Sequence, residues 1–210
     1  MKIITFYCDV DGRDYYTQCA KNLEKMCEEF DVDIEMTEKE SQGSYRDNCL
    51  SKPSFILEKL SQFKEPVCWV DVDTVFKKRP DAFYNCPLDQ VDVVFASANA
   101  AFGGIKASPI VFNYNETAVY FLKTWIRECA KVRAFDDKYF DHETLFKVIS
   151  DTRDSVKLGL FDGIYCVWPG FTDENTVIEM GLSDVDSKIN GLRAMGLDEE
   201  LIKWQTTGIV

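Results

Sequence analysis

Two carboxylates separated by a single residue are the clearest chemical feature of this sequence. Asp71 and Asp73 lie in the stretch PVCWVDVDTVF, which begins at Pro66 and ends at Phe76. The apolar residues 67–70 before them are β-branched or aromatic for the most part, a pattern that predicts a strand buried on both faces. Carboxylates that follow such a strand lie where open α/β sheets bind ligands. Their hard oxygen atoms suit Mg²⁺ or Mn²⁺, which bind one or two carboxylates together with substrate phosphates.

The segments around this stretch predict an α/β fold with a central, mostly parallel sheet flanked by helices. Residues 2–8 have the composition of a buried strand, and apolar residues spaced by three and four predict a helix over 14–30. A strand over 32–36 completes a β-α-β unit, which predicts parallel pairing. We expect further helices at 53–63, 80–84, 116–129 and 141–149, and further strands at 92–97, 109–112, 156–161 and 164–167.

Composition and charge restrict the class of partner. The chain has 210 residues, of which 46% are hydrophobic and 29% charged, as in ordinary globular domains. Its net charge of -12 argues against nucleic acid or an anionic membrane as the main partner. No apolar segment reaches membrane-spanning length. The eight cysteines include no C-x-x-C pair, which argues against a zinc cage and favours a reducing, cytoplasmic setting.

Haloacid-dehalogenase-like phosphatases also place D-x-D after a buried strand. In that alternative Asp71 is the nucleophile and Asp73 the general acid, and Ser97 and the pair Asp136-Asp137 would complete the site. However, a whole β-α-β unit precedes the motif here, whereas in those phosphatases the motif ends the first strand. The acids at 136 and 137 also follow a predicted helix instead of an apolar strand.

A set of motifs around the two carboxylates is shared with a second class of enzyme. KPSFI begins at Lys52, PVCWVDVDTVF follows, and Pro80 and Phe83 come next. From Met1 to Gly170 the chain resembles the metal-dependent, nucleotide-diphospho-sugar glycosyltransferases of the GT-A type, including their chlorella-virus members. The resemblance implies a GT-A-like (Rossmann-like) catalytic domain over 1–170, with a nucleotide-binding half over 1–98 and an acceptor half over 99–170. A helical C-terminal extension over 171–210 ends on GIV without a closing element, so we expect further domains of a longer, viral chain.

The resemblance implies a nucleotide-sugar site at the ends of the first and third strands. The backbone at a Gly-Gly pair is expected to approach the donor sugar closely, because glycine has no side chain to prevent it. Cations near the metal strand would pair with the diphosphate or hold the first carboxylate in place. The residues concerned are Tyr7, Cys8 and Asp9 for the base and ribose, Arg46 and Lys52 for the diphosphate, Asp71 for the ribose or metal, and Gly103 and Gly104 for the donor sugar.

The same resemblance implies a cofactor, Mn²⁺ or Mg²⁺, held by Asp71 and Asp73. His142, the only histidine of the chain, is the expected further ligand. Such an ion would bridge both phosphates and stabilise the leaving nucleoside diphosphate.

An inverting reaction would in addition need a carboxylate that removes the proton of the acceptor hydroxyl. The candidates are Asp141, then Asp137, followed by Asp136 and Glu143. Asp141 has a competing structural role as the N-cap of the predicted helix. Trp168 is either an acceptor platform or a core residue.

The sequence therefore predicts transfer of a hexose or deoxyhexose from a UDP-sugar to a hydroxyl of a glycan, free or on a glycoprotein. The preference for UDP over GDP comes from the resemblance alone. The alternatives are the phosphatase, a sugar-nucleotide nucleotidyltransferase, and a non-catalytic module that binds carbohydrate or metal. A nucleotidyltransferase should carry an early Gly-rich loop, for which Gly12-Arg13 is too short.

Overall fold

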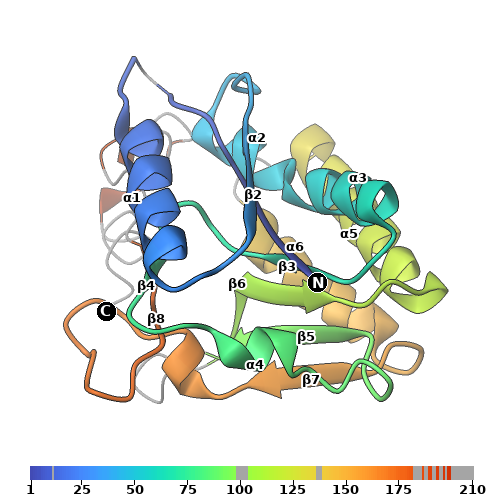
Figure 1. The fold of residues 1–210 in the computed structure, drawn as a ribbon. Coiled ribbons are helices and arrows are strands. Elements are labelled where there is room, and N and C mark those ends of the chain that lie inside the picture. The colour runs from blue at the N-terminus through green and yellow to red at the C-terminus, as the bar shows by residue number, and fades with distance from the viewer. Residues whose placement is uncertain are drawn as a thin grey trace.

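A six-stranded sheet runs through the centre of the molecule (Figure 1). The computed structural model describes residues 1–10, 12–97, 104–135 and 139–181, and beyond these only 186, 189, 190, 193, 196, 198 and 199. The strands of this sheet, in spatial order, are β2 (Ile34–Glu38), β1 (Lys2–Tyr7), β3 (Val67–Trp69), β6 (Ile105–Phe112), β5 (Val93–Ser97) and β7 (Leu158–Phe161).

One strand of the sheet runs against the others. β1 pairs in parallel with β2 and β3, and β5 pairs in parallel with β7. β6 is antiparallel to both of its neighbours, β3 and β5. The predicted α/β fold with a mostly parallel sheet is confirmed, and the first β-α-β unit pairs in parallel as expected. Because β6 is reversed, its beginning lies at the same edge of the sheet as the carboxyl ends of the other strands.

Helices cover both faces of the sheet (Figure 1). Alternate residues of a strand point to opposite faces. Ile4 and Phe6 of β1 accordingly pack with residues of α3, α5 and α6, whereas Ile3 packs with Leu23 and Cys27 of α1. The helices are α1 (Tyr15–Glu29), α2 (Tyr45–Leu50), α3 (Lys52–Phe63), α4 (Asp81–Tyr84), α5 (Glu116–Phe135) and α6 (Asp141–Thr152).

The segment after β7 differs from the prediction. The expected strand at 164–167 is replaced by a short 3₁₀ helix, Gly163–Tyr165, and an isolated bridge between Val167 and Glu179. The predicted helical extension begins with a strand, β8 (Ile178–Glu179), which pairs with β4 (Val75–Phe76) in a second, two-stranded sheet. This pairing joins residues 178–179 to the segment that follows the D-x-D motif.

Several element boundaries also move. The stretch between the predicted strand at 32–36 and the predicted helix at 53–63 contains α2, which begins after Ser44; the Ser44 hydroxyl accepts the backbone N–H of Asp47 at 3.0 Å. β2 begins at Ile34 instead of residue 32, and β6 begins at Ile105 instead of 109. α5 continues to Phe135. The additional residues of β6 and α5 lie toward the carboxyl edge of the sheet.

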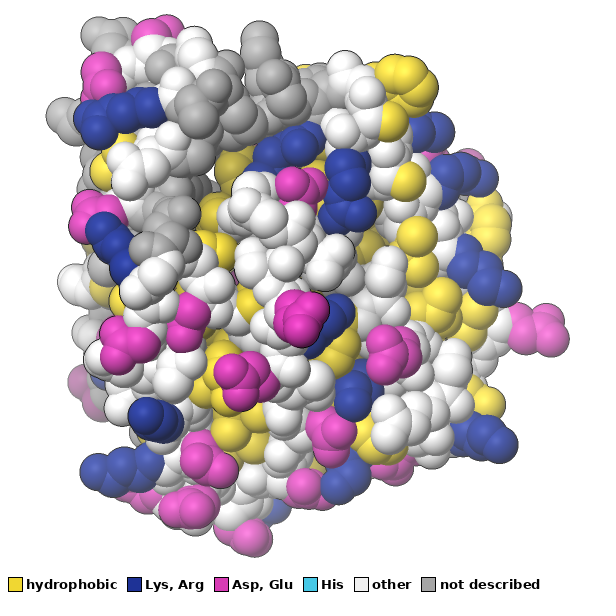
Figure 2. All heavy atoms as spheres, turned by 90° about the horizontal axis from the view of Figure 1, so that it is seen from above, with side chains coloured by type: hydrophobic (Ala, Val, Ile, Leu, Met, Phe, Trp, Pro, Cys, Tyr) yellow, Lys and Arg dark blue, Asp and Glu magenta, His cyan; other side chains and the backbone are white. Residues whose placement is uncertain are grey.

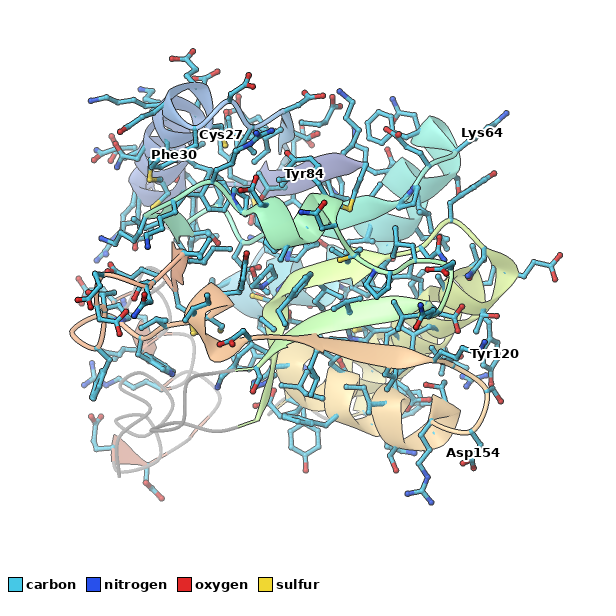
Figure 3. The ribbon with its side chains drawn as sticks, turned by 60° about the horizontal axis from the view of Figure 1, so that its bottom comes forward. Cys27, Phe30, Lys64, Tyr84, Tyr120 and Asp154 are labelled. Atoms are coloured by element: carbon cyan, nitrogen blue, oxygen red, sulfur yellow. The ribbon has the colours of Figure 1, made fainter. Side chains whose placement is uncertain are left out.

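Phe30 and Lys64 are the C-cap residues of α1 and α3, and Asp154 follows the end of α6; all three are labelled in Figure 3. Figure 2 shows acidic and basic side chains interspersed over one face of the molecule. No helix among the described residues is long and apolar enough to cross a membrane.

Candidate functional site

Three elements meet beside Asp71. The residue follows β3 directly, at the carboxyl end of that strand. α3 begins at Lys52 and α6 begins at Asp141, so the amino ends of two helices point toward the same place. Lys52, Asp71 and Asp141 are thereby brought together.

Lys52 lies between the two carboxylates. Its Nζ is 2.9 Å from Oδ1 of Asp71 and 2.6 Å from Oδ2 of Asp141. The same ammonium donates to the carbonyl oxygen of Ala107 at 3.4 Å and lies 5.4 Å from the ring centroid of Trp69. The Lys52 side chain is only 7% exposed. A cation this deeply buried requires charged partners, and here it has two.

The charges of this triad depend on one another. Burial by itself would lower the pKa of Lys52, but the carboxylates of Asp141 and Asp71 more than reverse that effect, and the pKa is raised. Lys52 is therefore a permanent cation at physiological pH. Nearby Cys49 stays a neutral thiol, because burial raises its pKa.

Contacts from the described residues use only one oxygen of Asp71. Oδ1 accepts the indole N–H of Trp69 at 2.9 Å as well as the Lys52 contact. The backbone N–H of Asp71 donates to Oγ of Ser108 at 2.8 Å. The side chain is 41% exposed, and no described residue donates a hydrogen bond to Oδ2. The carboxylate is thus held in a set orientation with one oxygen available to a ligand.

The D-x-D residues form a turn instead of the extended chain expected from the sequence. The N–H of Thr74 donates to the carbonyl of Asp71 at 3.0 Å, and Val72 is buried among Val10, Tyr16 and Ala20. Asp73 packs against Gly181, where an added Cβ would lie 2.1 Å from its Cγ.

The ligand atoms at this turn suit a hard cation, because Asp71 and Asp73 are carboxylates and Oδ2 of Asp71 accepts no hydrogen bond from a described residue. Within the described residues, however, no group of three His, Cys, Asp or Glu side chains is arranged to hold a metal ion. An ion at this place would accordingly depend on substrate phosphates for much of its coordination shell, which is common for Mg²⁺.

His142 lies at the rim of the site. Its Nε2 is 2.9 Å from the carbonyl oxygen of Ile105, and its ring stacks at an angle on Phe146 with centroids 4.9 Å apart. Because a carbonyl only accepts, Nε2 carries the proton. The neutral ring therefore offers Nδ1 as its lone-pair nitrogen, the arrangement by which metal-binding histidines are oriented.

Asp141 is not the N-cap that the sequence suggested. α6 begins at Asp141 itself, and Phe140 is the N-cap residue. The N–H of Phe140 donates to the carboxylate of Glu143 at 2.9 Å, so Glu143 performs the capping. Asp141 is 6% exposed, and its carboxylate faces Lys52. Of the two acids at this helix start, Glu143 therefore caps the helix and Asp141 belongs to the site.

The predicted base and ribose residues follow β1 at the same edge. Burial raises the pKa of Tyr7 and of the buried thiol of Cys8, so both stay neutral. Asp9 has a structural role: its Oδ1 accepts the N–H groups of Tyr16 and Thr17 at 2.8 and 3.2 Å. It thereby caps the amino end of α1 from outside the helix, and its Oδ2 accepts the hydroxyl of Thr17, so both oxygens are used within the protein.

The remaining predicted residues divide into two groups. Arg46 donates to the carbonyl oxygens of Tyr139 and Val132 at 2.9 and 3.0 Å, which ties α2 to both ends of the 133–139 segment. Gly104 has a φ of +88° and begins the approach to β6. Gly103 and Asp137, with the secondary candidate Asp136, lie outside the described residues.

Sequence reasoning missed some of the residues that shape the site. Trp69 was detectable, because residues two apart in a strand point the same way and Trp69 precedes Asp71 by two. Ser108 carried no signal, since it reaches Asp71 only through the pairing of β6 with β3.

A cavity of about 530 Å³ lies elsewhere, among residues of α1, β2 and α4 that include Cys27, Met36, Arg79 and Tyr84. Cys27 and Tyr84 lie near each other in Figure 3. This cavity is also lined by Asp33 and Ile34, at the beginning of β2. Because β2 and β3 both run parallel to β1, the beginning of β2 is opposite to the edge that carries Asp71. The cavity is separate from the candidate site.

Solved structures of similar shape are glycosyltransferases. One is the crystal structure of a glycosyltransferase involved in the glycosylation of the major capsid of the chlorella virus PBCV-1, with a TM-score of 0.62 and 13% identity over 85% of this chain and 92% of that one. The chain has a GT-A-like fold. LgtC, described as a galactosyltransferase in complex with donor and acceptor sugar analogs, has a TM-score of 0.52 and 10% identity over 98% of this chain and 99% of its own.

A third structure with this GT-A-like fold is the glycosyltransferase GlyE of Streptococcus pneumoniae TIGR4, with a TM-score of 0.56 and 12% identity over 99% of this chain and 63% of that one. No family model and no curated protein matches the sequence. The property shared at these identities is the fold. Lys52, Asp71 and Asp141 meet at the carboxyl edge of this sheet. Open α/β sheets generally bind their ligands at that edge.

Proposed function

We propose that the chain is a glycosyltransferase that moves a hexose or deoxyhexose from a UDP-sugar to a hydroxyl of a glycan, with Mn²⁺ or Mg²⁺. The observation that carries this proposal is the buried ammonium of Lys52, which contacts Asp71 and Asp141 at the carboxyl edge of a GT-A-like sheet. The similar structures support it, because their descriptions name glycosyltransferases, and that of LgtC names donor and acceptor sugars.

Asp71 and Asp73 would hold the metal ion, and substrate phosphates would complete its coordination shell. His142 does not form a group of three with them in the described part of the chain. When bound, such an ion supplies Lewis-acid stabilisation of the leaving diphosphate. The protein's own contribution is to fix Oδ1 of Asp71 through Lys52 and Trp69, so that Oδ2 is presented in one orientation. A carboxylate held from behind in this way needs little reorganisation when its ligand binds.

Asp141 would face the donor sugar. Its Oδ2 contacts Lys52, and no described residue donates a hydrogen bond to its Oδ1. In an inverting reaction Oδ1 would take the proton of the acceptor hydroxyl. In a retaining reaction Asp141 would hold hydroxyls of the donor sugar. Lys52 keeps Asp141 in place in either case.

Calorimetric titration of UDP into the protein tests the proposal, with and without Mn²⁺ and with UMP and GDP as comparisons. The expected result is UDP binding that depends on the metal and exceeds GDP binding. Absence of binding by any nucleoside diphosphate under both conditions would overturn the proposal.

Asp71→Asn provides the test of the site. It should abolish metal-dependent UDP binding, because the amide removes the charge that a hard cation requires. Asp154→Asn is the matched control, since Asp154 is 94% exposed and lies just after α6, at the remote end of the molecule. The phosphatase alternative predicts instead that the wild-type protein releases phosphate from simple monoesters and that Asp71→Asn stops this release.

A further inference from the structure

Lys106 is a partly buried cation for which the protein supplies no anionic partner among its described residues. It is the second residue of β6, at the carboxyl edge of the sheet. Its Nζ lies 5.6 Å from the ring centroid of Trp168, in a cation–π contact. No carboxylate and no hydrogen-bond acceptor of the described chain pairs with this ammonium.

Lys106 belongs to the same end of the molecule as Asp71. Cys166 connects the two, because its Sγ donates to the carbonyl of Ser108 at 3.8 Å and Oγ of Ser108 accepts the N–H of Asp71 at 2.8 Å. Both charges act on the same thiol: burial raises the pKa of Cys166 to about 12, Lys106 opposes this rise and Asp71 adds to it.

Two other lysines near the site, Lys52 and Lys77, have their charges compensated. Lys52 has Asp71 and Asp141, and Lys77 has Glu179, whose Oε2 is 3.1 Å from its Nζ. The face of an aromatic ring attracts a cation less strongly than a carboxylate does and accepts no hydrogen bond of ordinary strength. The Lys106 ammonium therefore has donor capacity left for a ligand.

The chemistry of the surroundings indicates which ligand this is. Asp71, Asp73 and Asp141 put acidic groups at this edge in a chain whose net charge is -12, and such groups repel a diphosphate. A fixed cation at the same edge offsets that repulsion and holds the phosphates beside the carboxylates. A partly buried ammonium is more effective in this role than an exposed one, because water screens it less.

We propose that Lys106 binds the diphosphate of the nucleotide-sugar and that the Trp168 ring keeps its ammonium in place. This proposal depends on the function proposed above. During transfer the bond between the anomeric carbon and the β-phosphate oxygen breaks, and the electron pair stays on that oxygen. The acceptor oxygen forms the new bond to the anomeric carbon and gives up its proton, to the Asp141 carboxylate in an inverting reaction or to the departing phosphate oxygen in a retaining one. Lys106 keeps its own proton throughout and stabilises the charge on the leaving diphosphate.

The experiment is calorimetric titration of UDP and of uridine into Lys106→Met and Lys106→Arg. Lys106→Met should weaken UDP binding about tenfold or more, the usual effect of losing a charged hydrogen bond, and leave uridine binding unchanged. Lys106→Arg should keep most of the UDP affinity, because it keeps the charge. Lys123→Met is the matched control, because Lys123 is exposed on α5. This variant should bind UDP as the wild type does.

Trp168→Phe provides a second, independent test that leaves the ammonium in the protein. It should weaken UDP binding by about three- to fivefold, because phenylalanine has a weaker cation–π face than tryptophan. Thermal melting of each variant checks that it is folded, and Lys106→Gln replaces Lys106→Met if the methionine variant is not.

The outcomes separate this proposal from the function on which it rests. Wild-type affinity for UDP in the folded Lys106→Met or Lys106→Gln variant would overturn the role of Lys106 and leave the glycosyltransferase proposal standing. Equal losses for UDP and uridine would also overturn it, since they would indicate general damage to the site. If the wild-type protein itself binds no nucleoside diphosphate, the glycosyltransferase proposal is overturned, and the role of Lys106 with it.

Discussion

Nζ of Lys52 lies 2.6 Å from Oδ2 of Asp141. This contact joins the amino ends of α3 and α6, two helices far apart in the sequence. The amino end of a helix carries a partial positive charge, which disfavours a lysine, and burial disfavours it further. The local environment at the first position of α3 therefore disfavours a lysine, and the carboxylates of Asp71 and Asp141 compensate for this.

Removing this cation should affect both stability and binding. Lys52→Met leaves Asp141 buried without a counter-charge, and we expect a loss of about 3 kcal/mol in the free energy of unfolding. UDP binding should weaken at least about tenfold, because Asp71 loses one of the contacts that orient it. Urea denaturation and calorimetry measure the two effects.

Lys59→Met is the control for that variant. Lys59 is also a buried lysine of α3, paired with Oε1 of Glu35 at 2.9 Å, but Glu35 is in β2 and not at the site. It should lower stability and leave UDP affinity intact. Equal UDP affinities in Lys52→Met and the wild type would contradict a role of Lys52 in the site.

The stability contributed by Lys52 should hardly change across neutral and moderately alkaline pH. Its pKa is raised above the ordinary lysine value, so its contribution is complete below that value and is lost only as pH rises through the higher folded-state pKa. The difference in melting temperature between wild type and Lys52→Met should accordingly be the same at about pH 6 and about pH 9. A difference that shrinks over this interval would show that the ammonium is not held by the two carboxylates.

Trp69→Phe isolates one contact to Asp71. The ring still packs against Phe6 and Phe55, but the indole N–H that donates to Oδ1 of Asp71 at 2.9 Å is lost. We expect a loss of about 1–2 kcal/mol in stability and a several-fold decrease in UDP affinity. UDP affinity unchanged from wild type would mean that Lys52 alone is enough to orient the carboxylate.

Gly181→Ala tests whether the chain after β8 supports Asp73. An added Cβ would lie 2.1 Å from Cγ and 2.4 Å from the carbonyl oxygen of Asp73, so one of the two segments must move. Metal-dependent UDP binding should weaken, and stability should fall by about 1–3 kcal/mol. Gly159→Ala is the comparison, because there the Cβ meets only methyl groups of Val94 and Val91, the nearest at 3.3 Å. It should keep wild-type UDP binding.

The pH dependence of UDP binding should reveal Lys106. Burial lowers the pKa of Lys106. The pKa of Cys166 is raised to about 12, so this thiol stays neutral and gives the ammonium no anionic partner. UDP affinity should then fall as pH rises through the lowered pKa, before an ordinary lysine loses its proton. In Lys106→Arg this decrease should be absent, since arginine stays charged. A decrease that persists unchanged in the arginine variant would assign it to another group.

Sequence reasoning was most reliable where local pattern and tertiary role agree. The apolar run before Asp71, the helix that begins near Lys52 and the helix that begins at Asp141 were all predicted, because each has periodicity and a start signal of its own. α2 was missed although Ser44 and Asp47 form a helix-start signature of Ser followed three residues later by an acid.

Other features carried no local signal. β4 and β8 have two residues each and exist only because segments about a hundred residues apart pair with each other. The contacts of Asp9 and Asp141 were equally hidden. Asp9, which was predicted to bind nucleotide, also caps α1. Asp141, which was the first candidate for the catalytic base and had a competing role as N-cap, contacts Lys52, and Phe140 is the N-cap. An acid near a helix start satisfies both descriptions, and only the packing of distant elements decides between them.

The reversed direction of β6 gives this edge of the sheet one connection more than an all-parallel sheet would have. Ser97 at the end of β5 and Ile105 at the beginning of β6 are partners there. The reversal also places Lys106, the second residue of β6, at the edge that carries Asp71, whereas a parallel strand would begin at the opposite edge. The direction of one strand therefore decides at which end of the sheet this ammonium lies.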